Sequence, residues 1–525
     1  MRFTRLLLPA ALFLIASPLV YAAPQQRETT TVEVVQVPVY VTTAGASVRG
    51  LTRDDFTLRV NGRPQKIDYF DVVDFASLSP DQARDPRQRR MYVLTFDVVN
   101  STPNSAVRAQ RAAEKYLAGA QPSDYFAVAL INRYDDIELV VPFTRDQALL
   151  RLAVANFSAG SSTDPLRLTV TPADRAVLIN TDSAELAELR RIGSGVAAEL
   201  AVEATRSMAA AQLDALAKLA ERMAPLEGYK HIVLLSNGFD SSVIFGGSRP
   251  ATSNIRIGSL AELTALRKQQ QPTLPGLDGR LPGSQMRMQR KFAAAGVFLD
   301  AIDLSGVRPF DMPSNDSLHL AVADTGGQVV EHRNDLAAAM QRLTDSQQIV
   351  YVLGFHAPDT GRKQNEIAVK VAGAPHGSTV AYREAYTSLA GRPSTHDGLR
   401  LADIISNDIP QNGITMTTSV ATAPKHATVN VTLPGRELLA LAGDGAWVKG
   451  DALIYVFAGQ TSVSFARKGI DIDVARARST GLGDGNVDIT QPFDLPPGKY
   501  AMKVLVRIEG HDTLAFARED FTIGD

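Results

Sequence analysis

Two polar segments that directly follow apolar runs contain the residues best placed for chemistry. Residues 97–102 read Asp-Val-Val-Asn-Ser-Thr and follow the apolar run 91–96, and residues 236–240 read Ser-Asn-Gly-Phe-Asp and follow the run 232–235. A continuous apolar run bounded by turn signals predicts a strand buried on both faces of a parallel sheet, and such sheets bind ligands beyond the carboxyl ends of their strands. We therefore expect the functional site at these two segments, with the two strands side by side and pointing the same way.

Catalysis has less support in the sequence than binding. Ser236 follows a strand, as hydrolase nucleophiles do, but it lacks a Gly-x-Ser-x-Gly context, and no histidine or acid can be assigned to orient it. The 8 histidines are scattered without metal-ligand spacing. Gly326-Gly327 reads as a helix stop, because no phosphate-binding glycine pattern surrounds it. We predict that the protein is not an enzyme and has no catalytic residues; a hydrolase that uses Asp97 or Ser236 is the weaker alternative.

The elements that position these segments alternate between strand and helix. Apolar runs predict strands at 91–96, 126–131, 137–143, 232–235, 297–302 and 349–355, and helical spacing predicts helices at 109–117, 148–155, 183–223, 286–295, 317–325 and 335–344. Such alternation predicts an α/β fold with a mostly parallel sheet covered by helices on both faces. We assign this Rossmann-like domain to 91–387, with a surface insertion rich in Gly, Pro and Ser at 246–283.

Two β-rich regions flank this domain. Residues 23–76 contain alternating apolar segments and Asn61-Gly62, the strongest short-range hairpin signal, so we predict an N-terminal β module. Residues 425–525 consist of short alternating segments separated by Gly and Asp turns, which predicts an all-β sandwich. Residues 388–424 begin with a stretch rich in Gly, Pro, Ser and Thr, and we assign them to a linker.

The amino terminus has the pattern of a secretory signal peptide. Arg2 and Arg5 precede the apolar run 6–20, and small residues stand ahead of Ala23-Pro24. The apolar run is shorter than the roughly 20 residues that a transmembrane helix needs, and no later stretch is long and apolar enough. We therefore predict a signal peptide at 1–22, export to the periplasm or the extracellular space, and no transmembrane segment in the mature chain.

Composition limits the classes of partner. The chain of 525 residues is 45% hydrophobic and 21% charged, which is typical of a globular protein with about three domains. Its formal net charge of −2 becomes −4 without Arg2 and Arg5 of the signal peptide, and this acidic balance argues against a nucleic-acid partner. The sequence has 0 cysteines, which excludes disulfides and thiol chemistry.

Seven motifs follow one another between about residues 30 and 387. They are Leu-Thr-Arg-Asp-Asp-Phe at 51–56, Asn-Gly-Arg-Pro-Gln-Lys-Ile at 61–67, Leu-Thr-Phe-Asp at 94–97, Leu-Glu-Gly-Tyr-Lys-His-Ile-Val-Leu-Leu-Ser-Asn-Gly-Phe at 226–239, Asp-Thr-Gly-Gly at 324–327, Tyr-Val-Leu-Gly-Phe at 351–355 and Val-Ala-Tyr-Arg-Glu-Ala-Tyr at 380–386. In these motifs the chain resembles the von Willebrand factor type A (VWA) domain, and more closely the VWA-related family first described from acidobacterial genomes. The resemblance implies a VWA-like α/β domain and says nothing about residues 388–525.

The same resemblance implies a divalent cation at the carboxyl edge of the sheet. The family holds it with an Asp-x-Ser-x-Ser loop, a Thr from a later loop and an Asp in a Thr-Asp-Gly turn, and these hard oxygen ligands suit Mg²⁺ or Ca²⁺. The match here is partial. Asp97 and Ser101 fit the ends of the first loop, Val99 stands at its middle serine, Asn237 replaces the later Asp, and Thr163 is the counterpart of the Thr.

The missing hydroxyl and carboxylate leave two outcomes open. In one, a degenerate site still binds Mg²⁺ or Ca²⁺, and Asn100 or Asp240 compensates in part for the missing ligands. In the other, the site is vestigial and Asp97 only accepts backbone and hydroxyl hydrogen bonds. Mg²⁺ demands near-octahedral oxygen ligands, and an amide carbonyl contributes no formal charge, so we expect any cation to bind more weakly than in a complete site.

These observations predict an exported protein that binds another protein, or mediates adhesion, through the carboxyl edge of its sheet. A structural component of the cell envelope with no ligand at this edge is the main alternative. The residues expected to contact the partner are Asn100, Thr102, Asn237 and Phe239.

Overall fold

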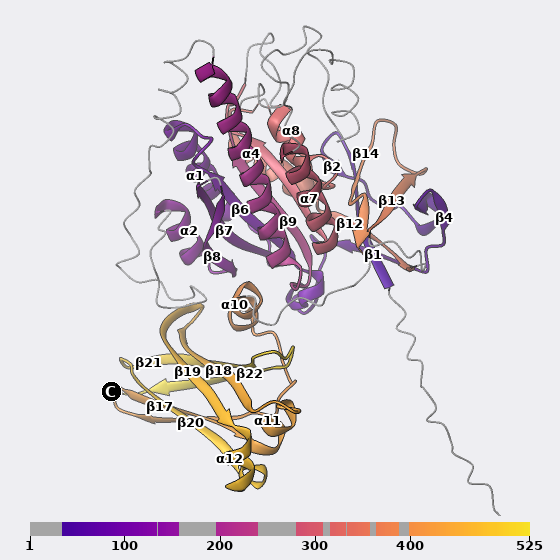
Figure 1. Ribbon diagram of the computed structural model, residues 1–525. Helices are drawn as coiled ribbons and strands as arrows, with labels where there is room; N and C mark the ends of the chain where they lie inside the picture. Colours follow the sequence, from indigo (N-terminus) through magenta and orange to yellow (C-terminus); the bar gives the residue numbers. More distant parts are fainter. Residues whose placement is uncertain are drawn as a thin grey trace, which may run out of the picture.

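The fold is described from a computed structural model of the chain. It describes residues 34–133, 135–156, 196–239, 280–307, 316–331, 333–357, 364–387 and 398–524. The predicted signal peptide, most of the predicted insertion at 246–283, and the candidate ligands Thr163 and Asp240 lie outside these residues. The described residues form an α/β domain, a β module beside it and a β-sandwich below it (Figure 1).

A six-stranded mixed sheet forms the centre of the α/β domain. Its order is β11-β10-β9-β6-β7-β8, and every neighbouring pair is parallel except β7 with β8, which is antiparallel. Counted along the chain, this is the order 6-5-4-1-2-3 of a doubly wound sheet. The strands are β6 (Arg90–Asp97), β7 (Asp124–Arg133), β8 (Asp136–Thr144), β9 (Tyr229–Ser236), β10 (Val297–Asp303) and β11 (Val329–Val330).

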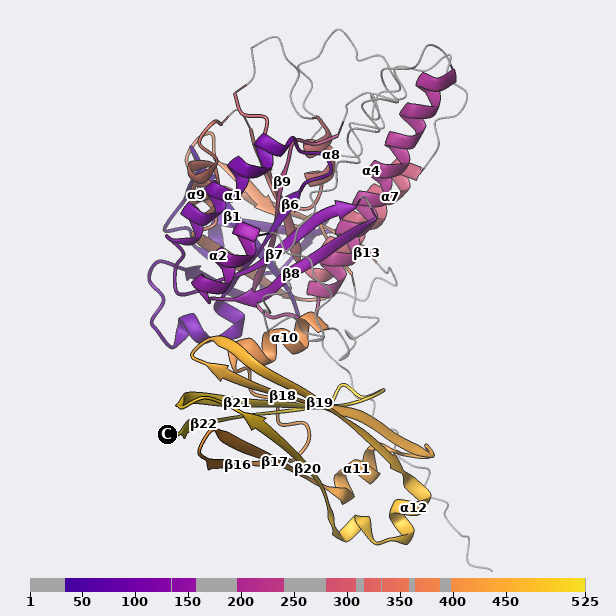
Figure 2. The ribbon, with the colours of Figure 1, turned by 90° about the vertical axis from the view of Figure 1, so that its left-hand side faces the viewer.

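Helices cover both faces of this sheet (Figure 2). One face packs against α1 (Pro103–Leu117), α2 (Gln147–Asn156) and α9 (Leu336–Ser346), and the other against α4 (Val196–Met223), α7 (Arg280–Ala295) and α8 (Asp316–Val322). All eight residues of β6 are buried, and alternate ones serve opposite cores: Tyr92 and Leu94 pack towards α1, Met91 and Val93 towards α4. The continuous apolar run at 91–96 thus reflects burial on both faces.

The β module combines strands of the predicted N-terminal module, 23–76, with strands from the carboxyl-terminal end of the predicted α/β region. The predicted hairpin at Asn61-Gly62 is confirmed, since β3 and β4 pair antiparallel around these two residues, which have φ of 49° and 77°. Strand β12, however, pairs antiparallel with β1 and β5, so the prediction that 349–355 is the last strand of the central sheet is wrong. An apolar run reports burial and not the identity of the neighbouring strand. The elements are β1 (Val34–Thr43), β2 (Ala46–Ser47), η1 (Arg53–Asp55), β3 (Phe56–Val60), β4 (Arg63–Gln65), β5 (Tyr69–Asp74), β12 (Ile349–His356), β13 (Gln364–Val371), β14 (Thr379–Tyr382) and β15 (Ala385–Thr387).

The carboxyl-terminal part is a sandwich of two antiparallel sheets, ordered β16-β17-β20 and β19-β18-β21-β22. Helix α10 (Gly398–Asn407) and strand β16 lie within 388–424, where the sequence predicted a linker. The apolar face of α10 packs on β18 and β21, which the polar stretch before it did not reveal. The remaining elements are β16 (Thr417–Ala423), β17 (His426–Pro434), α11 (Gly435–Leu441), β18 (Trp447–Ala458), β19 (Thr461–Asp473), α12 (Val474–Ser479), η5 (Leu482–Asp484), β20 (Asn486–Asp494), β21 (Gly498–Ile508) and β22 (Leu514–Ile523).

Polar contacts dock the sandwich at the amino ends of the central strands. Arg89, which directly precedes β6, forms a buried bidentate ion pair with Asp403 of α10, with N–O distances of 2.8 and 2.5 Å. The Asn407 side-chain amide donates to the Phe143 carbonyl of β8 at 3.3 Å. The carboxyl ends of the parallel strands therefore point away from the sandwich (Figures 1 and 2).

A buried hydrogen-bond chain connects the β module to the central sheet. The Tyr40 hydroxyl of β1 lies 3.0 Å from His231 Nε2 of β9, and His231 Nδ1 lies 2.9 Å from Asp300 Oδ2 of β10. Because a carboxylate only accepts, Nδ1–H of His231 donates to Asp300, while Nε2 pairs with the Tyr40 hydroxyl. Burial raises the pKa of Tyr40 well above its ordinary value, which keeps its hydroxyl protonated. The sheet and the module are thus held in one arrangement.

Candidate functional site

The two polar segments singled out in the sequence meet at the point where the strand order reverses. Strands β6 and β9 are parallel neighbours, with Phe96 opposite Leu235, which confirms the predicted arrangement. Their next residues are in direct contact, since the Ser236 hydroxyl donates to Asp97 Oδ2 at 2.6 Å. In doubly wound sheets the crevice outside this switch point is where ligands bind.

Asp97 is buried, and its carboxylate accepts four hydrogen bonds from the protein. Oδ1 accepts from the Asn100 backbone N–H at 3.0 Å, and Oδ2 accepts from Asn100 Nδ2 at 3.0 Å, from Gln212 Nε2 at 2.9 Å and from the Ser236 hydroxyl. A carboxylate offers about four lone-pair sites. The Asp97 charge is therefore satisfied by dipoles of the chain itself, and the loops after β6 and β9 are fixed to each other.

Gln212 of α4 is the member of this cluster that the sequence did not identify. Its side chain is buried, and it bridges the cluster by donating to Asp97 and accepting from Asn100 Nδ2 at 3.0 Å. The sequence did contain one sign of it: Gln212 is a polar residue on an otherwise apolar helix face. Neighbours such as Ala209 and Leu213 on that face pack in the core against β9. A buried polar side chain on an apolar face needs a hydrogen-bond partner, and here that partner is Asp97.

The other candidate ligands do not complete a cation site among the described residues. Val99 packs against the apolar core on the α4 face, and the Asn237 side-chain amide donates to the Ser305 hydroxyl at 3.1 Å. Among the described residues Ser101 Oγ is buried without a hydrogen-bond partner. Over the described ranges no three His, Asp or Glu side chains gather as a metal site. Within the described residues Asp97 is the one carboxylate among the predicted ligands, and three of its four donors converge on Oδ2, so this part of the donor set fits Mg²⁺ poorly.

The residues predicted to contact a partner serve mainly internal contacts. Asn100 bonds to Asp97 and Gln212, and the Phe239 ring packs on the α4-side core while its backbone N–H donates to Ser317 Oγ at 3.0 Å. Thr102 is exposed but caps α1, accepting from the Ser105 backbone N–H at 3.2 Å. Their role is therefore to hold the shape of this edge.

Ser236 is not arranged as a nucleophile. The residue is 1% exposed, and its hydroxyl donates to Asp97 and accepts from the Gly238 backbone N–H at 2.8 Å. A nucleophilic serine needs access to the substrate, which this buried hydroxyl lacks.

We expect no binding of divalent cations at this edge. Mg²⁺, Mn²⁺ and Ca²⁺ titrated calorimetrically into chelator-treated protein should give no saturable heat, because four hydrogen bonds from the protein already stabilise the Asp97 carboxylate. Gln212→Leu, which removes one of these bonds, is the matched variant. A saturable response of the wild-type protein that disappears in Asp97→Ala would contradict this expectation and restore the cation site.

Across the part of the chain that the structure describes, no helix combines the length and apolar character needed to cross a bilayer.

No protein-family model matches the sequence, and no curated protein matches it. Among solved structures the chain is similar to the crystal structure of the ArnB paralog VWA2 from Sulfolobus acidocaldarius, with 10% identity over 89% of this chain and 74% of that chain, at a TM-score of 0.22. A TM-score this low establishes no shared fold, so the fold class rests on the strand order: a mixed α/β domain joined to antiparallel sheets.

Proposed function

We propose that this chain is an exported, non-enzymatic protein whose VWA-like domain binds another protein through the carboxyl edge of its six-stranded sheet, without a bound cation. The observation that carries the proposal is the Asp97 cluster at the switch point. Hydrogen bonds from the protein stabilise the buried carboxylate there. They also hold the adjoining loops in one arrangement beside the crevice of the switch point. Export rests on the signal-peptide pattern of the sequence.

The surface beside the cluster has the mixed character of a protein-binding site. Val107 on the first turns of α1 is 39% exposed, and Val307, just after β10, is 59% exposed. Asn334 connects the two segments, because its side-chain carbonyl accepts from the Val307 backbone N–H at 3.1 Å and its backbone carbonyl accepts from Arg108 Nη2 at 3.4 Å. Exposed apolar groups within a polar rim are typical of interfaces that form and dissociate.

A cross-linking experiment tests this surface directly. The chain has 0 cysteines, so a single introduced cysteine is the only thiol. With a cleavable cross-linker in intact cells, Val307→Cys should yield a discrete cross-linked species that contains a second protein. Val463→Cys, at a valine of the sandwich that is 45% exposed, is the matched control and should yield none.

The same pair provides the affinity measurement. Val307→Glu should weaken binding of the identified partner by roughly tenfold, since a charge would replace an apolar contact in the interface, and Val463→Glu should leave it unchanged. Equal cross-linking from both cysteines, or none from Val307→Cys, would leave the structural envelope component as the better description.

A further inference from the structure

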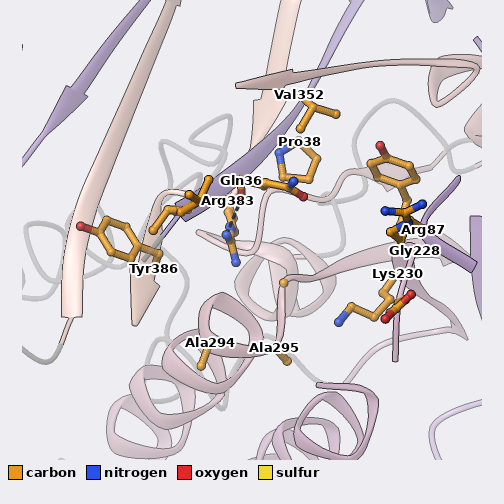
Figure 3. A pocket seen from close by; sticks show the side chains of 15 residues that line it. Gln36, Pro38, Arg87, Gly228, Lys230, Ala294, Ala295, Val352, Arg383 and Tyr386 are labelled. Carbon is orange, nitrogen blue, oxygen red and sulfur yellow. Dashed lines mark hydrogen bonds between the residues drawn. The ribbon is translucent and has the colours of Figure 1, made fainter. Parts of the chain in front are cut away.

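A cavity of about 370 Å³ lies at the opposite end of the central strands, between them and the β module (Figure 3). One wall comes from β1, β12 and the segment of β14 and β15, and the other from the start of β9 and the end of α7. Its volume falls within the range of small-molecule sites, roughly 300–1,000 Å³. The proposed function does not use this cavity.

Arg383 lines the cavity as a cation without a counter-ion in the part of the chain that the structure describes. Its Nη1 donates to the Ala293 carbonyl of α7 at 3.0 Å, and its Nη2 donates to the Gln36 carbonyl of β1 at 2.6 Å. Its Nε is buried and has no hydrogen-bond partner. Arg383 as a whole is half-buried, and among the described residues no carboxylate forms an ion pair with it, unlike the buried Arg89 and Arg90. Of its five N–H donors, the two bonds to carbonyls leave the others for a ligand.

Lys230 brings a second positive charge to the same cavity from the other wall (Figure 3). Its ammonium group is buried, has no carboxylate partner among the residues described, and donates to three carbonyls at the end of α4 and just after it, those of Met223, Ala224 and Leu226, at 3.1 to 3.3 Å. Burial, and then the charges of Arg383 and Arg89, lower the pKa of Lys230 to about 7. Burial alone lowers the pKa of Arg383 to about 10. Both cations would gain from a nearby negative charge.

The other charged residues at this cavity do not supply a negative charge to these two cations. Glu227 is exposed at the mouth, and Arg87, also exposed, is paired with Asp85 at 2.9 Å. Apolar groups complete the lining, among them Pro38, Ala295 and Val352. The cavity thus combines one cation on each wall with an otherwise apolar lining.

We propose that this cavity binds a small organic carboxylate, whose carboxylate group accepts from Arg383 and whose short apolar body lies against Pro38, Ala295 and Val352. A carboxylate matches the planar guanidinium better than a spherical anion does, because two oxygens can accept from two adjacent N–H groups. Lys230 strengthens binding through its charge, since its own donors are used by carbonyls. A bound ligand would touch both the β module and the α/β domain and would hold them together.

Calorimetric titration of the full chain at pH 7 tests the proposal with hexanoate as the probe. Hexanoate should bind saturably, and acetate more weakly because it lacks the apolar body. Hexanamide, which keeps the body and loses the charge, and inorganic phosphate, which keeps a charge and loses the body, should give no saturable heat. Tighter binding of phosphate than of hexanoate, or equal binding of hexanamide, would overturn the proposal.

Variants locate the binding. Arg383→Gln should weaken hexanoate binding by roughly tenfold or more, the loss expected for one charge-assisted hydrogen bond, whereas Arg87→Gln, which removes an equal charge at the mouth, should change it less than about twofold. Should Arg383→Gln fail to fold, as judged by circular dichroism, Ala294→Leu provides the second test. It fills the cavity from the α7 wall, leaves both cations in place and should abolish binding. Unchanged affinity in Ala294→Leu, or equal losses in both arginine variants, would place hexanoate elsewhere.

Discussion

Replacing Arg89 with methionine is expected to lower the free energy of unfolding by about 3 to 5 kcal/mol, the cost of removing one partner from a buried ion pair. The side chains of Arg89 and Asp403 are 2% and 3% exposed. Arg89 also donates from Nε to the Glu227 carbonyl at 3.2 Å and lies 5.1 Å from the centre of the Tyr125 ring. The variant leaves the Asp403 carboxylate buried, and among the described side chains the Asn407 amide, at 2.8 Å, is then its donor. The loss should therefore fall on the contact between α10 and the α/β domain.

Hydrogen exchange measured in increasing urea separates this effect from global unfolding. Exchange of α10 amides should accelerate in Arg89→Met while the amides of β9 stay protected.

The double variant Arg89→Met with Asp403→Leu should recover much of the loss, because an apolar pair in place of a buried ion pair is often neutral or better. Arg87→Met, at an exposed arginine nearby, is the control and should cost less than about 1 kcal/mol. A loss this small in Arg89→Met as well would show that the sandwich is held by other contacts.

The central sheet was predictable because its signals are local. The runs at 91–96 and 232–235 each sit between turn residues, and their apolar character on both faces already indicates buried parallel strands. Asn61-Gly62 likewise specifies its own hairpin, because the turn needs two consecutive positive φ values. Structure that is determined by residues only a few positions away can be predicted from the sequence.

Pairing between distant strands was not predictable in the same way. β12 is as apolar as β9, yet it joins β1 and β5 across about 300 residues of chain, which no local pattern encodes. The β module is consequently assembled from strands that precede the α/β domain in the sequence and strands that follow it, and the cavity that contains Arg383 lies where the module meets that domain. Single-sequence periodicity identifies buried strands, but not which sheet they enter.

The candidate site shows the same division. Asp97 was identified from its position after a buried strand, and Ser236 from the equivalent position after the next one. Gln212 lies in the middle of a 28-residue helix, 115 positions from Asp97, and only the packing of α4 against the sheet brings them together. A polar residue that completes a buried cluster from another element has no local signature apart from its place on an apolar face.

Replacing Asp97 with asparagine is the second change with a large expected effect, about 3 kcal/mol of unfolding free energy, because hydrogen bonds to a charged group contribute about 1.5 to 3 kcal/mol each and the replacement disrupts several. Asparagine has one oxygen and one N–H₂ group in place of two accepting oxygens. Whichever way it turns, the N–H₂ group faces a donor, either the Asn100 backbone N–H or the group formed by Gln212 Nε2 and the Ser236 hydroxyl. Addition of Mg²⁺ or of chelator should leave this loss unchanged.

Gln212→Glu makes the interpretation specific, because it moves the carboxylate to the opposite side of the same hydrogen bond. Alone, it places two carboxylates at the 2.9 Å contact and should also destabilise the protein by mutual repulsion. When it is combined with Asp97→Asn, the carboxylate introduced at position 212 can accept from the new amide at position 97 and from Asn100 Nδ2. The combined loss should then fall short of the sum of the single losses by about 2 kcal/mol, measured as the coupling in a double-mutant cycle by urea denaturation. Additive losses would show that the two side chains do not share this bond, and that donors other than Gln212 stabilise the carboxylate.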